Sequence, residues 1–262
     1  MTETITSDID ARGIVQLRLN RPAKRNSLSS QMIAELTAFA AAAQDRRDFR
    51  AIVLAGEGDV FCAGGDLDWM RQQMAADRQT RMTEARKLAE MLGALNSLPQ
   101  PLIGAVHGSA FGGGVGIACI CDVVLAAPET LFGLTETRLG LIPATIGPYV
   151  LARMGEGHAR RVFMSAKRFS AGVAMELGIV SRLVDRDALL GEAMREAEAY
   201  LSTAPGAVAA AKNLLRTLSR SVDPQRIEDS IAALADTWEQ DEAREGIAAF
   251  FEKRKPAWDR AD

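Results

Sequence analysis

Two glycine-rich stretches, Phe61-Cys62-Ala63-Gly64-Gly65-Asp66 and Phe111-Gly112-Gly113-Gly114-Val115-Gly116, carry the most information about the fold of this chain. Each stretch follows a short apolar strand and leads into a helix-like segment. The first turn of a helix exposes backbone N–H groups without partners, and these groups stabilise negative charge. Two such helix starts that face each other would hold one oxygen atom as it becomes anionic. The pattern therefore predicts an oxyanion site made of backbone amides.

Each stretch also has a purely structural interpretation. Residues 64–66 would form a tight turn in which Asp66 caps the next helix, and glycines 112–114 would let a strand and a helix pack closely. A dinucleotide-binding loop is a third alternative, but the GxGxxG order is absent and no acidic residue ends a following strand at the right distance. Two glycine turns that open two helices in one chain are together more specific than either alone, and they favour the oxyanion site.

One carboxylate, Glu136, stands out downstream because its neighbours in sequence are largely apolar. A carboxyl group among apolar side chains has a raised pKa and can act as acid or base near neutral pH. Alternatively, Arg138 would pair with Glu136 and hold it ionised, and the sequence leaves both possibilities open. A polarised carbonyl and one carboxylate suffice to move protons beside a thioester. We therefore predict an enzyme that acts on an acyl-CoA.

Composition excludes several other classes of protein. The chain has 262 residues, is 48% hydrophobic and carries a formal net charge of −3, so neither a nucleic-acid groove nor a membrane surface is expected. The sequence contains no transmembrane-length apolar run and does not begin with a secretory signal pattern, which predicts a cytoplasmic protein. Three cysteines in apolar surroundings are expected to be reduced core thiols. No metal-ligand spacing is present, so we expect no metal.

Hydrophobic patterning predicts an α/β body followed by helices. The expected strands are residues 15–19, 51–55, 102–106, 123–126 and 179–180. A helix capped by Ser29 or Ser30 follows the first strand, and further helices are expected from about residue 66 and over 80–98. Beyond about residue 185 the strand signals stop, and four helices are expected at 187–201, 207–218, 224–239 and 242–254. We assign residues 1–200 to the core and 201–262 to a C-terminal helical oligomerisation region.

Several single residues have a structural and a functional interpretation. His107 and Asp122 are expected to make hydrogen bonds within the fold. Arg21, Lys24 and Arg25 form either a solvated basic turn or a phosphate-binding site. The candidates for an acyl pocket, each equally a core residue, are Met70, Met74, Phe111, Ile142 and Tyr149.

Taken together, the motifs resemble the crotonase family, also called the enoyl-CoA hydratase/isomerase family. The matching stretches are 20–28, 61–67, 107–114, 132–136, 139–143 and 246–258. They span nearly the whole chain in the family's order. The resemblance implies a crotonase-like spiral of ββα units followed by a C-terminal all-helical trimerisation region. It also implies a homotrimer or a hexamer built as a dimer of trimers.

The resemblance assigns roles to individual positions. The amides of Gly65 and Gly113 would form the oxyanion hole, and Glu136 would be the family's second catalytic glutamate. The residues implied for the substrate and CoA site are Lys24, Arg25, Ala63, Gly65, Asp66, Leu67 and Gly113. Coenzyme A would enter as part of the acyl-CoA substrate, and no other cofactor is implied.

One position departs from the family pattern. The first catalytic glutamate of typical hydratases would fall at Gly116, which has no side chain. This departure favours a Δ3,Δ2-enoyl-CoA isomerase, whereas closer resemblance to the bacterial methylglutaconyl-CoA hydratase-like branch favours a hydratase. That resemblance is carried by residues 66–70, 111–117, 140–146 and 251–258. We predict a hydratase for a branched or glutaconyl-type 2-enoyl-CoA; the alternatives are the isomerase and a non-catalytic acyl-CoA-binding protein.

Overall fold

The computed structural model describes residues 4–219 and 222–259. Its main sheet has the order β1 (Ile5–Ile9), β2 (Ile14–Leu19), β3 (Ala51–Gly56), β4 (Leu102–Val106), β6 (Val123–Ala126) and β9 (Arg182–Leu183). β1 is antiparallel to β2, and all other neighbours in this sheet are parallel. A smaller sheet joins β5 (Ser109–Phe111), β7 (Leu131–Gly133) and β8 (Phe169–Ser170).

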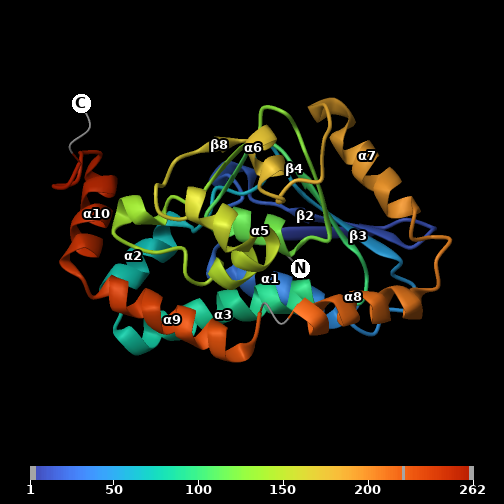
Figure 1. Ribbon diagram of the computed structural model, residues 1–262, viewed down its shortest axis with the longest axis horizontal. Coiled ribbons are helices and arrows are strands. Elements are labelled where there is room, and N and C mark those ends of the chain that lie inside the picture. The colour runs from blue at the N-terminus through green and yellow to red at the C-terminus, as the bar shows by residue number, and fades with distance from the viewer. Residues whose placement is uncertain (1–3, 220–221, 260–262) are drawn as a thin grey trace.

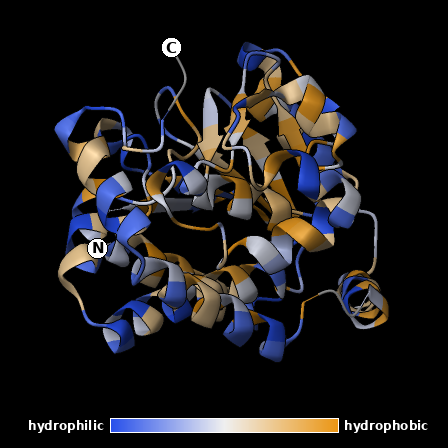
Figure 2. Ribbon diagram, turned by 60° about the vertical axis from the view of Figure 1, so that its left-hand side comes forward, coloured by the Kyte–Doolittle hydropathy of each residue, from blue (hydrophilic) through white to orange (hydrophobic). Residues whose placement is uncertain are grey.

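Helices cover both faces of the main sheet. Their bounds are η1 (Pro22–Lys24), α1 (Ser30–Ala43), α2 (Leu67–Ala75), α3 (Arg78–Asn96), α4 (Gly113–Ile120), η2 (Glu136–Leu139), α5 (Gly147–Val162), α6 (Ala171–Glu176), α7 (Arg186–Glu198), α8 (Pro205–Ser219), α9 (Pro224–Trp238) and α10 (Asp241–Glu252). Figure 1 shows α7 on one side of the sheet and α1 with α3 on the other. Along β3, Ile52 and Leu54 pack toward α1, while Val53 packs toward α7. Figure 2 accordingly shows that the hydrophobic segments of the chain lie mainly in the interior, between the helices and the sheet.

Most of the predicted elements are confirmed. The strands expected at 15–19, 51–55, 102–106 and 123–126 correspond to β2, β3, β4 and β6. The predicted cap of α1 is Ser29, whose hydroxyl accepts a hydrogen bond from the Met32 amide at 3.2 Å. Strand signals do end at β9, and the four predicted C-terminal helices correspond to α7, α8, α9 and α10.

The prediction of a strand at 179–180 is wrong. Ile179 and Val180 are buried, but both of their amides donate to the carbonyl of Ala174 at the end of α6. They therefore close a helix, and the strand β9 begins two residues later. Apolar character at these two positions reflects packing against the core, which a helix end requires as much as a strand does.

The helices after α7 differ in how they pack on the body. α9 lies against α3, where Ile231 packs with Ala85 and Ala89. α10 packs on η2, and its Ile247 shares an apolar cluster with Leu139 and with Leu141 just after η2. By contrast, no residue within the described helix α8 is buried. The division at residue 200 and the assembly into trimers stay predictions.

Candidate active site

The first glycine turn is fastened to two neighbouring segments. The Phe61 and Cys62 amides donate to the carbonyls of His107 and Ser109, and the Phe111 amide donates to the Cys62 carbonyl. Leu28 binds the residues on both sides of Gly65. The Leu28 amide donates to the Gly64 carbonyl, and the Leu28 carbonyl accepts from the Asp66 amide. In the described part of the chain, these bonds leave the Gly65 amide without an acceptor.

The second glycine turn opens α4 directly beside the first. Gly112 precedes the helix with φ of 48°, and its carbonyl accepts from the amides of Val115 and Gly116. The Gly113 amide has no acceptor among the described residues. A Cβ placed on Gly112 would lie 4.0 Å from the Cα of Gly64, so the two turns are in contact. The predicted pair of free amides is therefore present, one in each of two contacting turns.

Glu136 places its carboxyl group at this junction. A Cβ on Gly112 would come within 2.9 Å of Glu136 Oε1, a distance that only glycine avoids. Although the residue as a whole is only partly buried, Oε2 is fully buried and has no hydrogen-bond partner in the described structure. Burial raises the pKa of Glu136 to about 7, against the weaker opposing effect of its own amide and that of Thr135.

The alternative role of Arg138 is not realised. Within residues 4–219 and 222–259, Glu136 forms no ion pair with Arg138 or with any other cation. The carboxyl group therefore sits in the environment that the apolar neighbours predicted. A group that titrates near neutral pH can both accept and return a proton.

All eight predicted site residues line one cavity of about 650 Å³. They are Lys24, Arg25, Ala63, Gly65, Asp66, Leu67, Gly113 and Glu136. Of the candidates for an acyl pocket, Met70, Phe111 and Ile142 also line it, whereas Met74 and Tyr149 do not. Tyr149 instead donates its hydroxyl to the carbonyl of Ala89. The roles assigned to these positions in binding and catalysis stay predictions.

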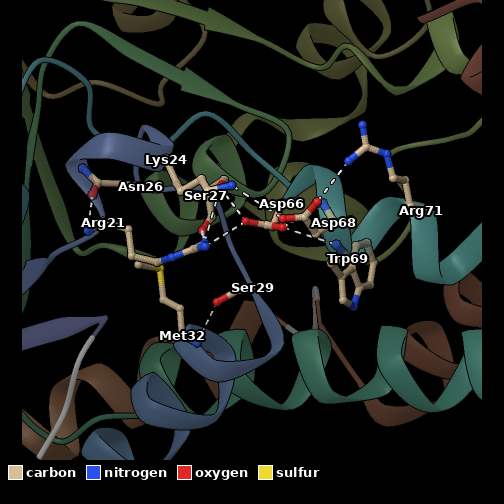
Figure 3. A network of polar contacts seen from close by, with 10 residues as sticks. All are labelled: Arg21, Lys24, Asn26, Ser27, Ser29, Met32, Asp66, Asp68, Trp69 and Arg71. Atoms are coloured by element: carbon tan, nitrogen blue, oxygen red, sulfur yellow. Dashed lines mark hydrogen bonds and ion pairs between the residues drawn. The ribbon is translucent and has the colours of Figure 1, made fainter. Parts of the chain in front are cut away.

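Asp66 ties the first turn to α2 and to Arg21 through polar contacts that Figure 3 shows. Its carboxylate caps α2 by accepting from the amides of Asp68 and Trp69, and it pairs with Arg21 at 2.9 Å. Burial alone would raise the pKa of Asp66, but Arg21 and the two amides outweigh it and the pKa is lowered. The Asp66 side chain is thus committed to structure, as the capping interpretation expected.

Arg21 and Asn26 belong to the same support, and sequence reasoning did not single out Asn26. Arg21 is largely buried and donates to the Ser27 carbonyl as well as to Asp66, so it is not available for phosphate. Asn26 is fully buried, and its amide group donates to the carbonyls of Glu57 and Val60. The residue type could have identified Asn26 in the sequence, because asparagine tolerates the left-handed conformation (φ 52°) that it adopts here.

Lys24 and Arg25 are exposed at the rim of the cavity. Lys24 lies 3.5 Å from Asp68 in a loose, exposed pair. Arg25 adopts φ of 53°, and its carbonyl accepts from the Ala63 amide, which ties this basic turn to the first glycine turn. Both cations are therefore exposed to solvent where they line the cavity, and their role in binding phosphate stays a prediction.

The position of the absent carboxylate is filled by apolar side chains. A Cβ on Gly116 would lie 2.5 Å from Ile146 Cγ2 and 3.7 Å from Leu92 Cδ1. Ile146 is buried at the start of α5 and lines the cavity. A side chain at residue 116 therefore has no room unless Ile146 moves. Sequence reasoning identified the missing glutamate but not the residue that occupies its space.

Other candidate residues prove structural. Burial lowers the pKa of His107, whose Nε2 lies 2.9 Å from the Gly58 carbonyl. Asp122 accepts from the Leu102 amide and pairs with Lys212. The three cysteines are buried and unbridged, and burial raises the pKa of each thiol to about 12. The described residues contain no cluster suited to a metal ion, and no helix among them is long and apolar enough to span a bilayer.

Comparison with known proteins finds a matching family, similar sequences and similar solved structures. The family model described as enoyl-CoA hydratase/isomerase matches residues 10–261. The probable enoyl-CoA hydratase echA8 of Mycobacterium tuberculosis is 34% identical over 256 residues, covering 97% of each chain. An enoyl-CoA hydratase from Shewanella pealeana is 35% identical with a TM-score of 0.81, covering 98% of this chain and 97% of the other.

A second solved structure gives a higher TM-score than the first. An enoyl-CoA hydratase from Mycobacterium avium gives a TM-score of 0.88 at 29% identity, covering 99% of this chain and 100% of the other. The predicted fold class, a crotonase-like α/β body followed by a helical C-terminal region, is therefore confirmed. Association of that region into trimers stays a prediction.

Proposed function

Because the chain belongs to the enoyl-CoA hydratase/isomerase family of enzymes, we propose that it adds water across the double bond of a 2-enoyl-CoA. The observation that carries this proposal is the buried carboxyl group of Glu136, whose Oε2 has no hydrogen-bond partner in the described structure, beside two unpartnered amides. The names of the relatives and the motifs of the methylglutaconyl-CoA hydratase-like branch support hydration in particular.

The oxyanion site lowers the barrier by stabilising charge on the thioester. The carbonyl oxygen accepts hydrogen bonds from the Gly65 and Gly113 amides, and it becomes more negative as the nucleophile adds to Cβ. Both glycines line the cavity, and neither amide has a competing acceptor in the described structure. One donor of this kind is worth about 2.7–4 kcal/mol of barrier.

Glu136 supplies the proton transfers. In its ionised form, the carboxylate takes a proton from water while the water oxygen bonds to Cβ and the π electrons move toward the thioester. The resulting carboxylic acid then gives that proton to Cα, which restores the carboxylate and completes the addition of one water. A pKa of about 7 suits both steps, because neither protonation state is strongly disfavoured.

The remaining parts of the assignment rest on the resemblance and on the shape of the cavity. Lys24 and Arg25 bind phosphate groups of CoA at the rim, and Ala63 and Leu67 line the path to the thioester. The acyl group is branched or glutaconyl-type. The protein acts in the cytoplasm as a homotrimer or a dimer of trimers and needs no further cofactor.

A specific observation favours isomerisation as the second candidate. Ile146 and Leu92 form an apolar wall beside Gly116, where a two-glutamate hydratase would hold its water with a second carboxylate. In the isomerase, Glu136 takes a proton from Cα and returns it at Cγ, so that the double bond moves without any water. The two candidate reactions share the oxyanion site. They differ in whether Glu136 moves a proton from water to Cα or from Cα to Cγ.

The direct test offers the purified protein a 2-enoyl-CoA and, separately, the corresponding 3-enoyl-CoA. Hydration of the first supports the proposal, and turnover of the second alone supports the isomerase. We expect Glu136→Gln to lower kcat by about 10²- to 10⁴-fold, with CoA-ester binding largely intact. Glu129→Gln makes the same chemical change at an exposed site and serves as the control. Glu136→Gln activity within a few-fold of wild type would remove Glu136 from the proposed role.

A further inference from the structure

The last helix, α10, packs directly on η2, the short helix that carries Glu136. Among the described elements, α10 is the one against which η2 packs most extensively. η2 contains no buried residue of its own, so its neighbours hold it in place. A hydrogen bond from the Thr137 hydroxyl to the Met164 carbonyl, at 3.2 Å, adds a second attachment. The position of Glu136 therefore depends on contacts from outside η2, and above all on α10.

α10 and the end of η2 approach each other backbone to backbone at two glycines. A Cβ on Gly246 would lie 2.6 Å from the carbonyl carbon of Leu139 and 2.8 Å from its oxygen. A Cβ on Gly140 would overlap the backbone carbonyl of Glu242 and would lie 2.6 Å from the Ala243 amide nitrogen. Because each obstacle is backbone and not the end of a flexible side chain, neither glycine accepts a Cβ unless the two segments separate.

Apolar packing and one hydrogen bond connect this contact to Glu136. Ile247 follows Gly246, is fully buried and shares an apolar cluster with Leu139 and Leu141. The Leu141 amide in turn donates to the Glu136 carbonyl at 3.1 Å. A shift of the segment that faces α10 is therefore transmitted to the backbone of Glu136.

α10 also contacts the helix that follows the other half of the site, and Figure 1 shows α10 beside α2. The guanidinium of Arg71 on α2 lies 4.3 Å from the centre of the Phe251 ring on α10. α2 begins two residues after Gly65. One helix thus touches both the segment that carries Glu136 and the helix that follows the Gly65 amide.

We propose that α10 positions the Glu136 carboxyl group relative to the two oxyanion amides, and that Gly246 is the positioning residue because it lets η2 approach the helix closely. This inference rests on the proposed function, since it concerns the group to which we assign the proton transfers. It gives the C-terminal region a role within its own chain, beside the predicted role in oligomerisation.

The size of the expected effect follows from the contact distance. A methyl group at residue 246 reaches ordinary van der Waals contact only after the two backbones separate by roughly 1 Å. A misplacement of about 1 Å at a reacting group can lower a rate by about 10²-fold. The close approach at Gly246 is therefore tight enough to matter for catalysis.

The main test compares Gly246→Ala with Gly191→Ala. Alanine is the better helix former at both positions, so lost helix propensity does not explain a lower activity. A Cβ on Gly191, in the exposed face of α7, meets no atom within 4 Å, which makes this variant the matched control.

The measurement is kcat and KM with 2-hexenoyl-CoA, or with 3-hexenoyl-CoA if only isomerisation occurs. We expect Gly246→Ala to lower kcat by roughly 10- to 100-fold and to change KM by less than about threefold, because the ester still binds. Gly191→Ala is expected to leave both constants unchanged. A Gly246→Ala kcat equal to that of wild type, or a loss confined to KM, would overturn the proposal.

A gentler pair of variants covers the case in which Gly246→Ala does not fold. Ile247→Val and Ile231→Val each remove one methyl group from a fully buried isoleucine. Ile247 packs on the η2 segment, whereas Ile231 packs on α3. We expect kcat to fall by roughly 3- to 10-fold in Ile247→Val and by less than about twofold in Ile231→Val. Equal losses would show a general effect of stability and would contradict positioning.

Failure of the proposed function gives a different result from failure of the positioning role. If wild type turns over no enoyl-CoA, the reaction assignment fails, and crystal structures of wild type and Gly246→Ala still test the positioning role. We then expect the Glu136 carboxyl group to move by roughly 1 Å relative to the Gly65 and Gly113 nitrogens, with the main sheet unchanged. Ile247→Val takes the place of Gly246→Ala if the latter does not fold. A carboxyl group that keeps its place would end the proposal.

Discussion

At the scale of a single residue, the role that we propose for Glu136 works against stability. Its carboxyl group is buried and its Oε2 has no hydrogen-bond partner in the described structure, which is costly when the group is ionised. A glutamine of nearly the same shape would keep the site filled without that cost. The buried carboxyl therefore has no evident structural benefit to the fold, which is consistent with the proton-transfer role that we propose for it.

The pKa of Glu136 gives this cost a defined pH dependence. In the folded protein the pKa is about 7, above the ordinary value of 4.5, so the folded state binds the proton more tightly. The contribution of Glu136 to stability is thus fully present below about pH 4.5 and is lost as the pH rises through about 7.

We expect Glu136→Gln to raise the free energy of unfolding by roughly 2–3 kcal/mol at about pH 8.5, and to change it little at about pH 4. Urea unfolding of both proteins at the two pH values measures the difference, with Glu129→Gln as control. A stabilisation that is the same at both pH values would show that charge burial is not its cause.

At the scale of the element, the first glycine turn is held by the N-terminus of α2 and by the segment around η1. Asp66 caps α2 as the sequence predicted. The buried partners Arg21 and Asn26 were not foreseen in that role, because their contacts cross 45 residues in one case and 34 in the other. Local patterns identify a cap, but they do not identify the distant side chain that neutralises it.

Two helix caps in the same chain provide a matched comparison. Asp77 caps α3 at an exposed position, whereas Asp66 caps α2 and also pairs with the largely buried Arg21. We expect Asp77→Ala to lower the free energy of unfolding by about 1 kcal/mol and Asp66→Ala by roughly 2–3 kcal/mol. Urea denaturation at neutral pH measures both, and equal losses would mean that the Arg21 pair adds nothing.

Strand length and hydrophobic pattern together decided which strands were predictable, because β1 has five residues but is polar at its centre and was not predicted. β2, β3, β4 and β6 have four to six residues and appear as apolar or alternating runs. β5, β7, β8 and β9 have only two or three residues, too few to establish a period. The smaller sheet was therefore not predicted, although it carries the strand that leads into Gly112.

At the scale of the whole molecule, the site is assembled from segments that are distant in sequence. The turns at Gly65 and Gly113 meet through backbone hydrogen bonds between residues 61–62 and 107–111. Glu136 then joins them from η2, and α9 and α10 close over the cavity with Trp238 and Phe250. The glycine motifs and the lone carboxylate were recognisable because they depend on residue type. The Ile146 wall was not, because it results from α5 packing against α4.

The most direct test of the central claim is a crystal structure of the protein with a non-reactive acyl-CoA analogue bound. We expect the thioester oxygen to lie roughly 2.7–3.1 Å from the backbone nitrogens of both Gly65 and Gly113. The Glu136 carboxyl group is expected to face Cα of the acyl group. A thioester oxygen held by one amide or by neither, or a Glu136 side chain turned away from Cα, would contradict the account.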